Sequence, residues 1–246
     1  MICPLCRRHN KVNAIVLISA QGEWDVVKDY YHPTEISSSP YGDWFIMDIE
    51  DNRNVMFFQS GWGKISASGS TQYVIDQWNP EVLINLGTCG GFEGEIQKGD
   101  IIVVNKTITY DILEQMGDSQ AAIDHFSSKL KTISLEKIEG LRWREHLMIS
   151  ADQDIVAKKV PFLKTQFHAI AADWESSSIA FIANKNQKDI YILRGVSDIV
   201  RETGSEAYGN LSNFQAGAKL VMTTLLDILP HILKQIKSQN LRPESE

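Results

Sequence analysis

Cysteine is scarce in this chain, with only Cys3, Cys6 and Cys89 present among 246 residues. Thiols so few and so unevenly spaced cannot build the disulfide framework of a small secreted protein. The first residues contain no apolar signal core, and no segment approaches the roughly 18 to 20 consecutive apolar residues that a membrane span requires. We therefore expect a cytoplasmic protein that neither crosses nor binds a membrane.

Positive charge is also in short supply, since 24 Lys and Arg residues stand against 31 Asp and Glu residues and give a net charge of -7. The basic surface that nucleic-acid binding requires is missing, which favours a small-molecule substrate. Hydrophobic residues make up 43% and charged residues 22%, as in an ordinary globular protein. Because no linker interrupts the chain, we expect one domain over residues 13–237, between a flexible N-terminal extension (1–12) and a polar tail (238–246).

Metal ligands are sparse as well. Cys3, Cys6 and His9 lie close together in the sequence, and closely spaced thiolates do form zinc sites. A second pair of ligands is absent, however, and four ligands are usual. We therefore expect neither a metal nor another cofactor.

Apolar segments rich in β-branched residues alternate with segments of helical periodicity. This alternation predicts an α/β fold in which helices cover both faces of a mixed, mostly parallel central sheet. We expect Pro230 to kink or split the last helix, and a ligand to bind at the carboxyl ends of strands. The predicted strands are residues 14–20, 44–49, 55–59, 82–86, 101–105 and 190–193, and the predicted helices are residues 23–31, 61–78, 173–186 and 213–236.

Three segments carry candidate chemistry. In residues 85–91, glycines let backbone N–H groups approach a ligand and Thr88 adds a hydroxyl, although a turn that requires positive φ would look the same. Glu175 follows Trp174 at the start of a predicted helix, where a solvated acid is also common. Asp198 follows Ser197 at the end of a predicted strand, where it is either a partly buried acid or a helix N-cap.

Together these segments resemble the superfamily of purine nucleoside phosphorylases and methylthioadenosine (S-adenosylhomocysteine) nucleosidases. The resemblance spans roughly residues 14–229, and residues 60–67 and 98–103 look like two further motifs of the family. It implies a nucleoside phosphorylase-like fold of three layers. It also implies cleavage of the bond between a base and its ribose through a transition state of oxocarbenium character.

Within this resemblance, each candidate residue acquires a role. Asp198 would donate a proton to N7 of a purine while Ser197 positions it, and Glu175 would accept hydrogen bonds from the ribose hydroxyls. Trp174 would pack against the sugar or base, and Trp62 would lie near the same pocket. The predicted catalytic residues are Asp198, Glu23, Ser197 and Arg194, and the predicted substrate-binding residues are Glu175, Trp174, Trp62, Thr88, Gly90, Asp154 and Ile155.

Hydrolysis is favoured over phosphorolysis. Phosphorylases of the family bind phosphate through arginines, but Asn85 and the acidic segment 21–25 occupy the matching positions here. The glutamate that activates water in the nucleosidases aligns with Trp24, so Glu23 or Asp25 would serve after a shift of one residue, and we select Glu23. A phosphorylase and a non-catalytic nucleoside-binding protein remain the alternatives.

The base pocket also departs from the family. Residues 150–155 match the stretch in which methylthioadenosine nucleosidases place a phenylalanine against adenine, and Asp154 replaces that ring. A carboxylate accepts hydrogen bonds, so it could bind N1–H of a 6-oxopurine or an exocyclic amine. The resemblance further implies a homodimer or a larger homo-oligomer, with residues 110–123 as the expected contact.

Overall fold

The computed structural model describes residues 12–201 and 203–240. Most of both predicted terminal segments lies outside these residues, and so do Cys3, Cys6 and His9. The strands are β1 (Ala14–Ile18), β2 (Ser37–Ser39), β3 (Gly42–Ile49), β4 (Asn52–Gln59), β5 (Val82–Phe92), β6 (Ile101–Thr109), β7 (Ser128–Lys129), β8 (Trp143–Ser150), β9 (Ala171–Asp173), β10 (Ile190–Arg201) and β11 (Gly204–Ser205). The helices are α1 (Gln21–Tyr31), α2 (Gly63–Trp78), α3 (Ser119–His125), the short 3-10 helix η1 (Ala157–Lys159), α4 (Val160–Phe167), α5 (Ser176–Lys185) and α6 (Leu211–Asn240).

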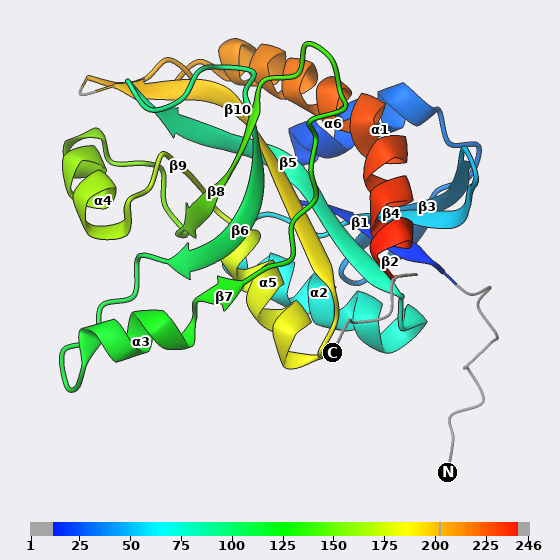
Figure 1. The fold of residues 1–246 in the computed structure, drawn as a ribbon, viewed down its shortest axis with the longest axis horizontal. Helices are drawn as coiled ribbons and strands as arrows, with labels where there is room; N and C mark the ends of the chain where they lie inside the picture. Colours follow the sequence, from blue (N-terminus) through cyan, green and yellow to red (C-terminus); the bar gives the residue numbers. More distant parts are fainter. Residues whose placement is uncertain (1–11, 202, 241–246) are drawn as a thin grey trace.

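All of the strands belong to one mixed sheet, in the order β11-β10-β6-β8-β9-β5-β1-β4-β3-β2, with β7 paired to β6. Strands β4, β1, β5 and β10 are parallel neighbours. Because β5 pairs with both β9 and β10, the strands β10, β6, β8, β9 and β5 also close into a small ring (Figure 1). The predicted α/β fold is confirmed.

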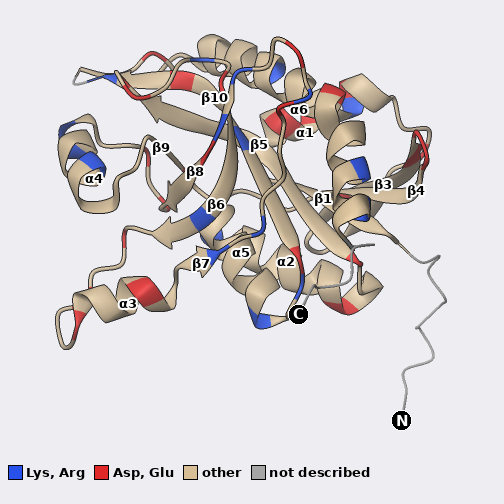
Figure 2. Ribbon diagram, viewed as in Figure 1, with Lys and Arg blue, Asp and Glu red and all other residues tan. Residues whose placement is uncertain are grey.

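Helices cover both faces of the sheet, as the sequence predicts. Along β1, Val16 and Ile18 belong to the hydrophobic core under α1 and α6, whereas Ile15 and Leu17 belong to the core that includes α2 and α5. All five residues of β1 are buried, which explains why this strand is a continuous apolar run without alternation. Figure 1 shows the two helix pairs around the sheet, and Figure 2 shows acidic and basic residues interspersed over the molecule.

The last helix differs from the prediction. Pro230 does not split it, because α6 is one helix from Leu211 to Asn240. The burial of Leu229, Ile232 and Leu233 on either side of the proline offsets the lost backbone hydrogen bond. By length and composition α6 could also cross a membrane, but 56% of its most apolar window is buried inside the protein. Packing against the sheet therefore accounts for its apolar character.

The two strands that carry most of the site residues, β5 and β10, are longer than predicted. The glycine segment is neither a loop nor a turn, because β5 continues to Phe92 and pairs there with β9 and β10. Likewise, Asp198 does not follow a strand and caps no helix, because β10 continues to Arg201. The pairing of β10 with β5 shifts register between Val196 and Asp198, which is the mark of a β-bulge. Bulges turn side chains to new directions beside functional sites.

Candidate active site

Glu23 lies at the start of α1 and reaches β5. Its Oε2 accepts a hydrogen bond from the Ala20 amide at 3.1 Å and caps the helix. Its Oε1 accepts two more from Thr88, from the amide at 2.6 Å and from Oγ1 at 2.8 Å. The carboxylate is buried, with 3% of the residue exposed. Glu23 and Thr88 therefore meet inside the protein, as two members of one polar cluster.

The neighbours of Glu23 point elsewhere. Trp24 is buried in the hydrophobic core, where its ring lies 5.5 Å from that of Phe45. Asp25 is exposed and forms an ion pair with Lys28 at 2.9 Å. Of the three adjacent residues 23–25, only Glu23 contacts the glycine-containing part of β5. These contacts therefore favour Glu23 over Asp25 as the acid that takes the position aligned with Trp24.

Arg194 is fully buried on β10, beside the same part of β5. Its Nε forms an ion pair with Asp173 at 2.7 Å, and Nη2 donates to Asn85 Oδ1 at 2.6 Å. Burial lowers the pKa of Arg194, but the carboxylates of Asp173, Glu23 and Glu175 outweigh it and hold that pKa above its ordinary value. A permanent positive charge therefore sits among acidic side chains.

One nitrogen of this guanidinium, Nη1, has no hydrogen-bond partner among the described residues. It lies directly over Gly87, where an added Cβ would come within 1.8 Å of Nη1 and 3.1 Å of Glu23 Oε1. Glycine is required at position 87 because any side chain would displace the guanidinium. The unpaired N–H group of Arg194 and the Glu23 carboxylate consequently both lie beside Gly87 on β5.

Glu175 is the next acidic group. It caps the N-terminus of α5, and its Oε1 accepts a hydrogen bond from the Gly63 amide at 3.0 Å. Burial raises the pKa of Glu175 to about 8; the charge of Arg194 opposes this effect and the carboxylates of Asp173 and Glu23 add to it. A carboxyl group held in this way accepts hydrogen bonds from hydroxyl groups and is protonated near neutral pH.

This raised pKa predicts how Glu175→Gln affects stability at different pH values. Because the folded state holds the proton of Glu175 more tightly than the unfolded chain does, ionisation of Glu175 costs stability as the pH rises from about 4.5 to about 8. Glutamine does not ionise. The difference in melting temperature between Glu175→Gln and wild type should therefore become more positive across that interval, as thermal unfolding in a pH series will show. A constant difference would mean that Glu175 does not titrate there.

Asp198 and Ser197 lie at the bulge in β10, and both are buried. The Ser197 hydroxyl donates to Asp198 Oδ1 at 2.7 Å. Across from them, a Cβ added at Gly90 would lie 3.8 Å from Asp198 Oδ2 and 2.7 Å from Ile155 Cδ1. Asp198, Gly90 and Ile155 therefore form one wall, about 10 Å along β5 from Gly87 at the usual rise of a strand.

Two tryptophans lie at the outer side of the cluster. The rings of Trp62 and Trp174 are 4.9 Å apart and tilted by 35°. They directly precede Gly63 and Glu175, the two residues joined by a hydrogen bond. Trp62 is 67% exposed, so its ring is an accessible aromatic surface beside Glu175. Neither ring lies in the core, in contrast to Trp24.

Asp154 is placed less deeply than the other predicted residues, because its side chain is exposed. It still lies near the wall formed by Asp198, Gly90 and Ile155, since it directly precedes Ile155. Burial is the main cause that raises the pKa of Tyr110 to about 12, and the charge of Asp154 contributes to the rise. Burial and then Asp154 likewise raise the pKa of Tyr208, whose hydroxyl donates to the Ile155 carbonyl at 2.9 Å.

Sequence analysis missed part of this network. Asp173, the ion-pair partner of Arg194, also accepts a hydrogen bond from Ser150 Oγ at 2.5 Å and holds the backbone at Ser176. Nothing in the local sequence pattern shows that β9 and β10 bring Asp173 to Arg194. Among the described residues, no three His, Cys, Asp or Glu side chains are grouped to hold a metal ion.

Comparison with known proteins places this site in a class. A model of the phosphorylase superfamily matches residues 14–234. The chain belongs to the phosphorylase superfamily. Within it, the chain is similar to the 5′-methylthioadenosine/S-adenosylhomocysteine nucleosidase of Buchnera aphidicola subsp. Acyrthosiphon pisum (strain APS), at 32% identity over 158 residues that cover 60% of this chain and 68% of the relative. The corresponding protein of Anoxybacillus flavithermus is 25% identical over 198 residues, which cover 75% and 84%.

Solved structures share the fold. The 5′-methylthioadenosine/S-adenosylhomocysteine nucleosidase of Neisseria meningitidis, in complex with methylthio-immucillin-A, aligns with a TM-score of 0.73 at 17% identity and covers 91% of this chain and 99% of its own. The futalosine hydrolase of Helicobacter pylori gives the same TM-score and identity, with 91% and 100% covered. The expected family and fold are confirmed, and the similar proteins named here are nucleosidases or, in one case, a hydrolase.

Proposed function

We propose that this chain hydrolyses the N-glycosidic bond of a purine nucleoside related to methylthioadenosine or adenosylhomocysteine and releases the free base and a ribose derivative. One observation carries the proposal: four buried acidic or basic side chains, Glu23, Glu175, Arg194 and Asp198, gather around β5. The distance along β5 between Gly87 and Gly90 is on the scale of a nucleoside. The names of the similar proteins agree with this substrate class.

The base end of the substrate would lie against Asp198, Gly90 and Ile155. As the bond from C1′ to the base breaks, its electron pair moves to the base, and Asp198 gives its proton to N7 of that base. Ser197, which donates to Asp198 Oδ1, orients the carboxyl group. Glu175 accepts hydrogen bonds from the ribose hydroxyls and aligns the sugar for departure.

Water would be held between Glu23 and Arg194. A carboxylate offers about four lone-pair sites, and hydrogen bonds from Ala20 and Thr88 occupy three of those on Glu23. The remaining site belongs to Oε2, which accepts only from Ala20, and the carboxylate lies beside Gly87 together with Arg194 Nη1. The water oxygen would bond to C1′ of the oxocarbenium ion while one of its protons passes to Glu23.

Phosphate fits this position poorly. Its dianion would lie beside the carboxylates of Glu23 and Asp173, which outnumber the one buried guanidinium of Arg194. Like charges at close range inside a protein are costly, so the site favours a neutral nucleophile. This arrangement favours water over phosphate.

Release of free base from a panel of purine nucleosides, with and without inorganic phosphate, tests the proposal. Release that is independent of phosphate is expected. Release that requires phosphate would make the chain a phosphorylase, and nucleoside binding without any release would make it a non-catalytic binding protein. Either of these results would overturn the proposed reaction.

Trp62 and Trp174 would contact the part of the nucleoside that extends beyond the ribose. They lie beside Glu175, since they directly precede Gly63 and Glu175, which are joined by a hydrogen bond. Trp62 leaves most of its ring exposed, so it can cover an apolar 5′-substituent and remove that surface from water. We infer that an apolar 5′ group raises affinity.

Asp154 would set the preference among bases. Its carboxylate lies near Tyr208 and the Ile155 carbonyl, at the base end of the site. Since a carboxylate accepts hydrogen bonds, we expect wild type to prefer a base that offers N1–H or an exocyclic amine in this direction. Asp154→Ala should reduce kcat/KM for the preferred nucleoside by about 10-fold, the scale of one hydrogen bond to a charged group. Equal turnover of adenine and hypoxanthine nucleosides by both proteins would contradict the role.

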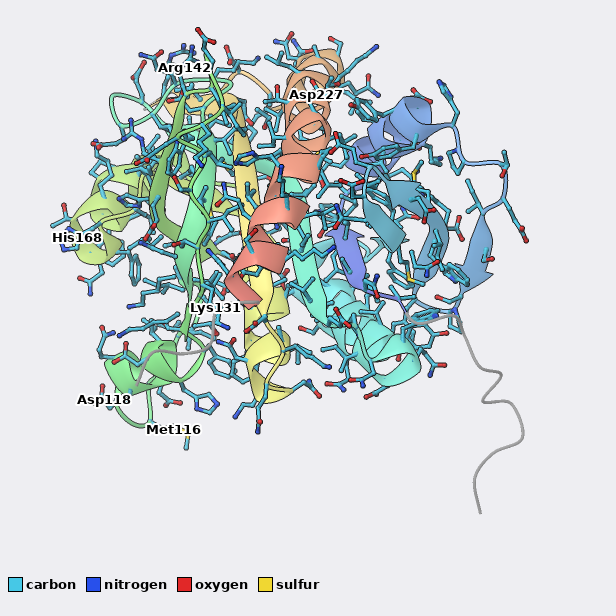
Figure 3. The ribbon with its side chains drawn as sticks, turned by 45° about the vertical axis from the view of Figure 1, so that its right-hand side comes forward. Met116, Asp118, Lys131, Arg142, His168 and Asp227 are labelled. Atoms are coloured by element: carbon cyan, nitrogen blue, oxygen red, sulfur yellow. The ribbon has the colours of Figure 1, made fainter. Side chains whose placement is uncertain are left out.

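We also propose that the protein is a cytoplasmic homodimer. Leu113 and Met116, in the loop between β6 and α3, are 81% and 99% exposed, and Ile65 at the start of α2 is 87% exposed. Figure 3 shows Met116 at the edge of the molecule beside α3. Exposed apolar side chains of this kind favour a subunit contact. Analytical ultracentrifugation measures the mass directly, and a monomer at micromolar concentration would contradict the assembly.

A further inference from the structure

Ser205 makes a contact that the reaction described above does not use. The short strand β11 turns back against β10, where Ser205 pairs with Val200. This turn carries the Ser205 hydroxyl to Asp198, and Oγ donates a hydrogen bond to Oδ2. The Ala207 amide in turn donates to Ser205 Oγ at 3.0 Å. Because that amide engages the hydroxyl oxygen, the hydroxyl hydrogen is directed toward Asp198.

The oxygen that Ser205 contacts is the one on the base side of the carboxyl group. Oδ1 is already held by Ser197, whereas Oδ2 lies on the side of Gly90, 3.8 Å from the position of a Cβ there. The segment that carries Ser205 is fixed a second time, since the Tyr208 hydroxyl donates to the Ile155 carbonyl at 2.9 Å. Ser205 therefore lies over the same wall that the purine would contact.

We propose that Ser205 is a positioning residue that makes Asp198 a stronger proton donor; this inference rests on the proposed function. The Ser205 hydroxyl occupies one lone pair of Oδ2 and leaves the other to carry the proton. In the reaction the O–H bond of the Asp198 carboxyl group breaks, and that proton forms a bond to N7 of the leaving base. Ser205 keeps its own hydrogen throughout. Its hydrogen bond strengthens as negative charge develops on Oδ2, which stabilises the carboxylate that remains.

Other titratable groups near Asp198 do not account for a difference in pH profile between wild type and a Ser205 variant. Cys89 lies on β5, and Tyr208 lies on the segment after β11, with Asp154 beyond it. Burial raises the pKa of the Cys89 thiol and that of the Tyr208 hydroxyl, so both are neutral in the working range. Asp154 and Glu175 are present alike in wild type and in a Ser205 variant. A difference between their pH profiles therefore reports on Ser205.

The experiment measures kcat and kcat/KM for base release over a pH series in wild type, Ser205→Ala, Ser205→Thr and Ser212→Ala. Ser212 is the matched control, because its hydroxyl contacts only Asn210 on the surface. Ser205→Ala should lower kcat by about 10-fold and move the alkaline limb of kcat/KM upward by about one pH unit, as the loss of one hydrogen bond to a charged group predicts. Ser205→Thr should restore both, and Ser212→Ala should match wild type.

Two results would overturn the inference and spare the proposed function. The first is that Ser205→Ala matches wild type in both kcat and pH profile. The second is that Ser205→Ala and Ser205→Thr lose activity equally while the alkaline limb stays unmoved, which is the pattern of a purely structural role. Melting curves of each variant separate unfolding from these outcomes. Wild type that binds nucleosides without releasing base would instead overturn the proposed function, and this inference with it.

Discussion

Asp198→Asn is expected to lower kcat for base release by about 100- to 10,000-fold, the range that a general acid supplies. Asparagine has nearly the same shape and can still accept the Ser197 hydrogen bond, but it has no proton to give to a departing purine. KM should change by only a few fold, since the groups that hold the sugar are untouched. Steady-state kinetics with a purine nucleoside gives both constants.

Asp227→Asn provides the matched control for this variant. Asp227 lies on α6 (Figure 3) and accepts a hydrogen bond from Tyr30 on the protein surface. The same chemical change at that position should leave kcat unaltered. Asp198→Asn with kcat within 10-fold of wild type would show that proton transfer to the base does not pass through this residue, and the mechanism would need another acid.

Glu23→Gln is the second substitution with a large expected effect. The amide oxygen can still accept both hydrogen bonds from Thr88, and only the one from the Ala20 amide is lost. The amide cannot take a proton from water, however, and the loss of a general base typically costs about 100- to 10,000-fold in rate. We expect kcat to fall within that range while KM stays nearly constant, as measured in the same assay.

Asp25→Asn is the control for Glu23, because sequence comparison alone leaves both acids as candidates. Asp25 is exposed and paired with Lys28, so its amide variant should behave as wild type. If Asp25→Asn lost activity and Glu23→Gln retained it, the assignment of the water site beside Arg194 and Gly87 would be wrong. The two variants thus show which of the two acids beside Trp24 acts on water.

Much of this site could be predicted because several of its residues are adjacent in the sequence. Glu175 beside Trp174, and Ser197 beside Asp198, are adjacent pairs that occur in the order typical of the family. The structure places Glu175 and the Ser197–Asp198 pair in buried positions around β5, as that order implies. Local sequence was therefore enough to select these residues.

Contacts between distant strands could not be predicted in this way. Asp173 and Arg194 are 21 positions apart and form a buried ion pair only because β9 and β10 both lie against β5. Glycines 87 and 90 resemble a turn in the sequence. In the structure they leave room for the side chains of Arg194 and Ile155 to cross the strand. A glycine in the sequence does not reveal which distant side chain occupies the space beside it.

The central claim is that water, held by Glu23 and Arg194, replaces the base on C1′ of the sugar. Incubation of wild-type protein with a purine nucleoside in water labelled with heavy oxygen, with phosphate present, tests it most directly by mass spectrometry of the sugar product. We predict free sugar that carries one labelled oxygen per molecule. A sugar 1-phosphate without the label would contradict the account.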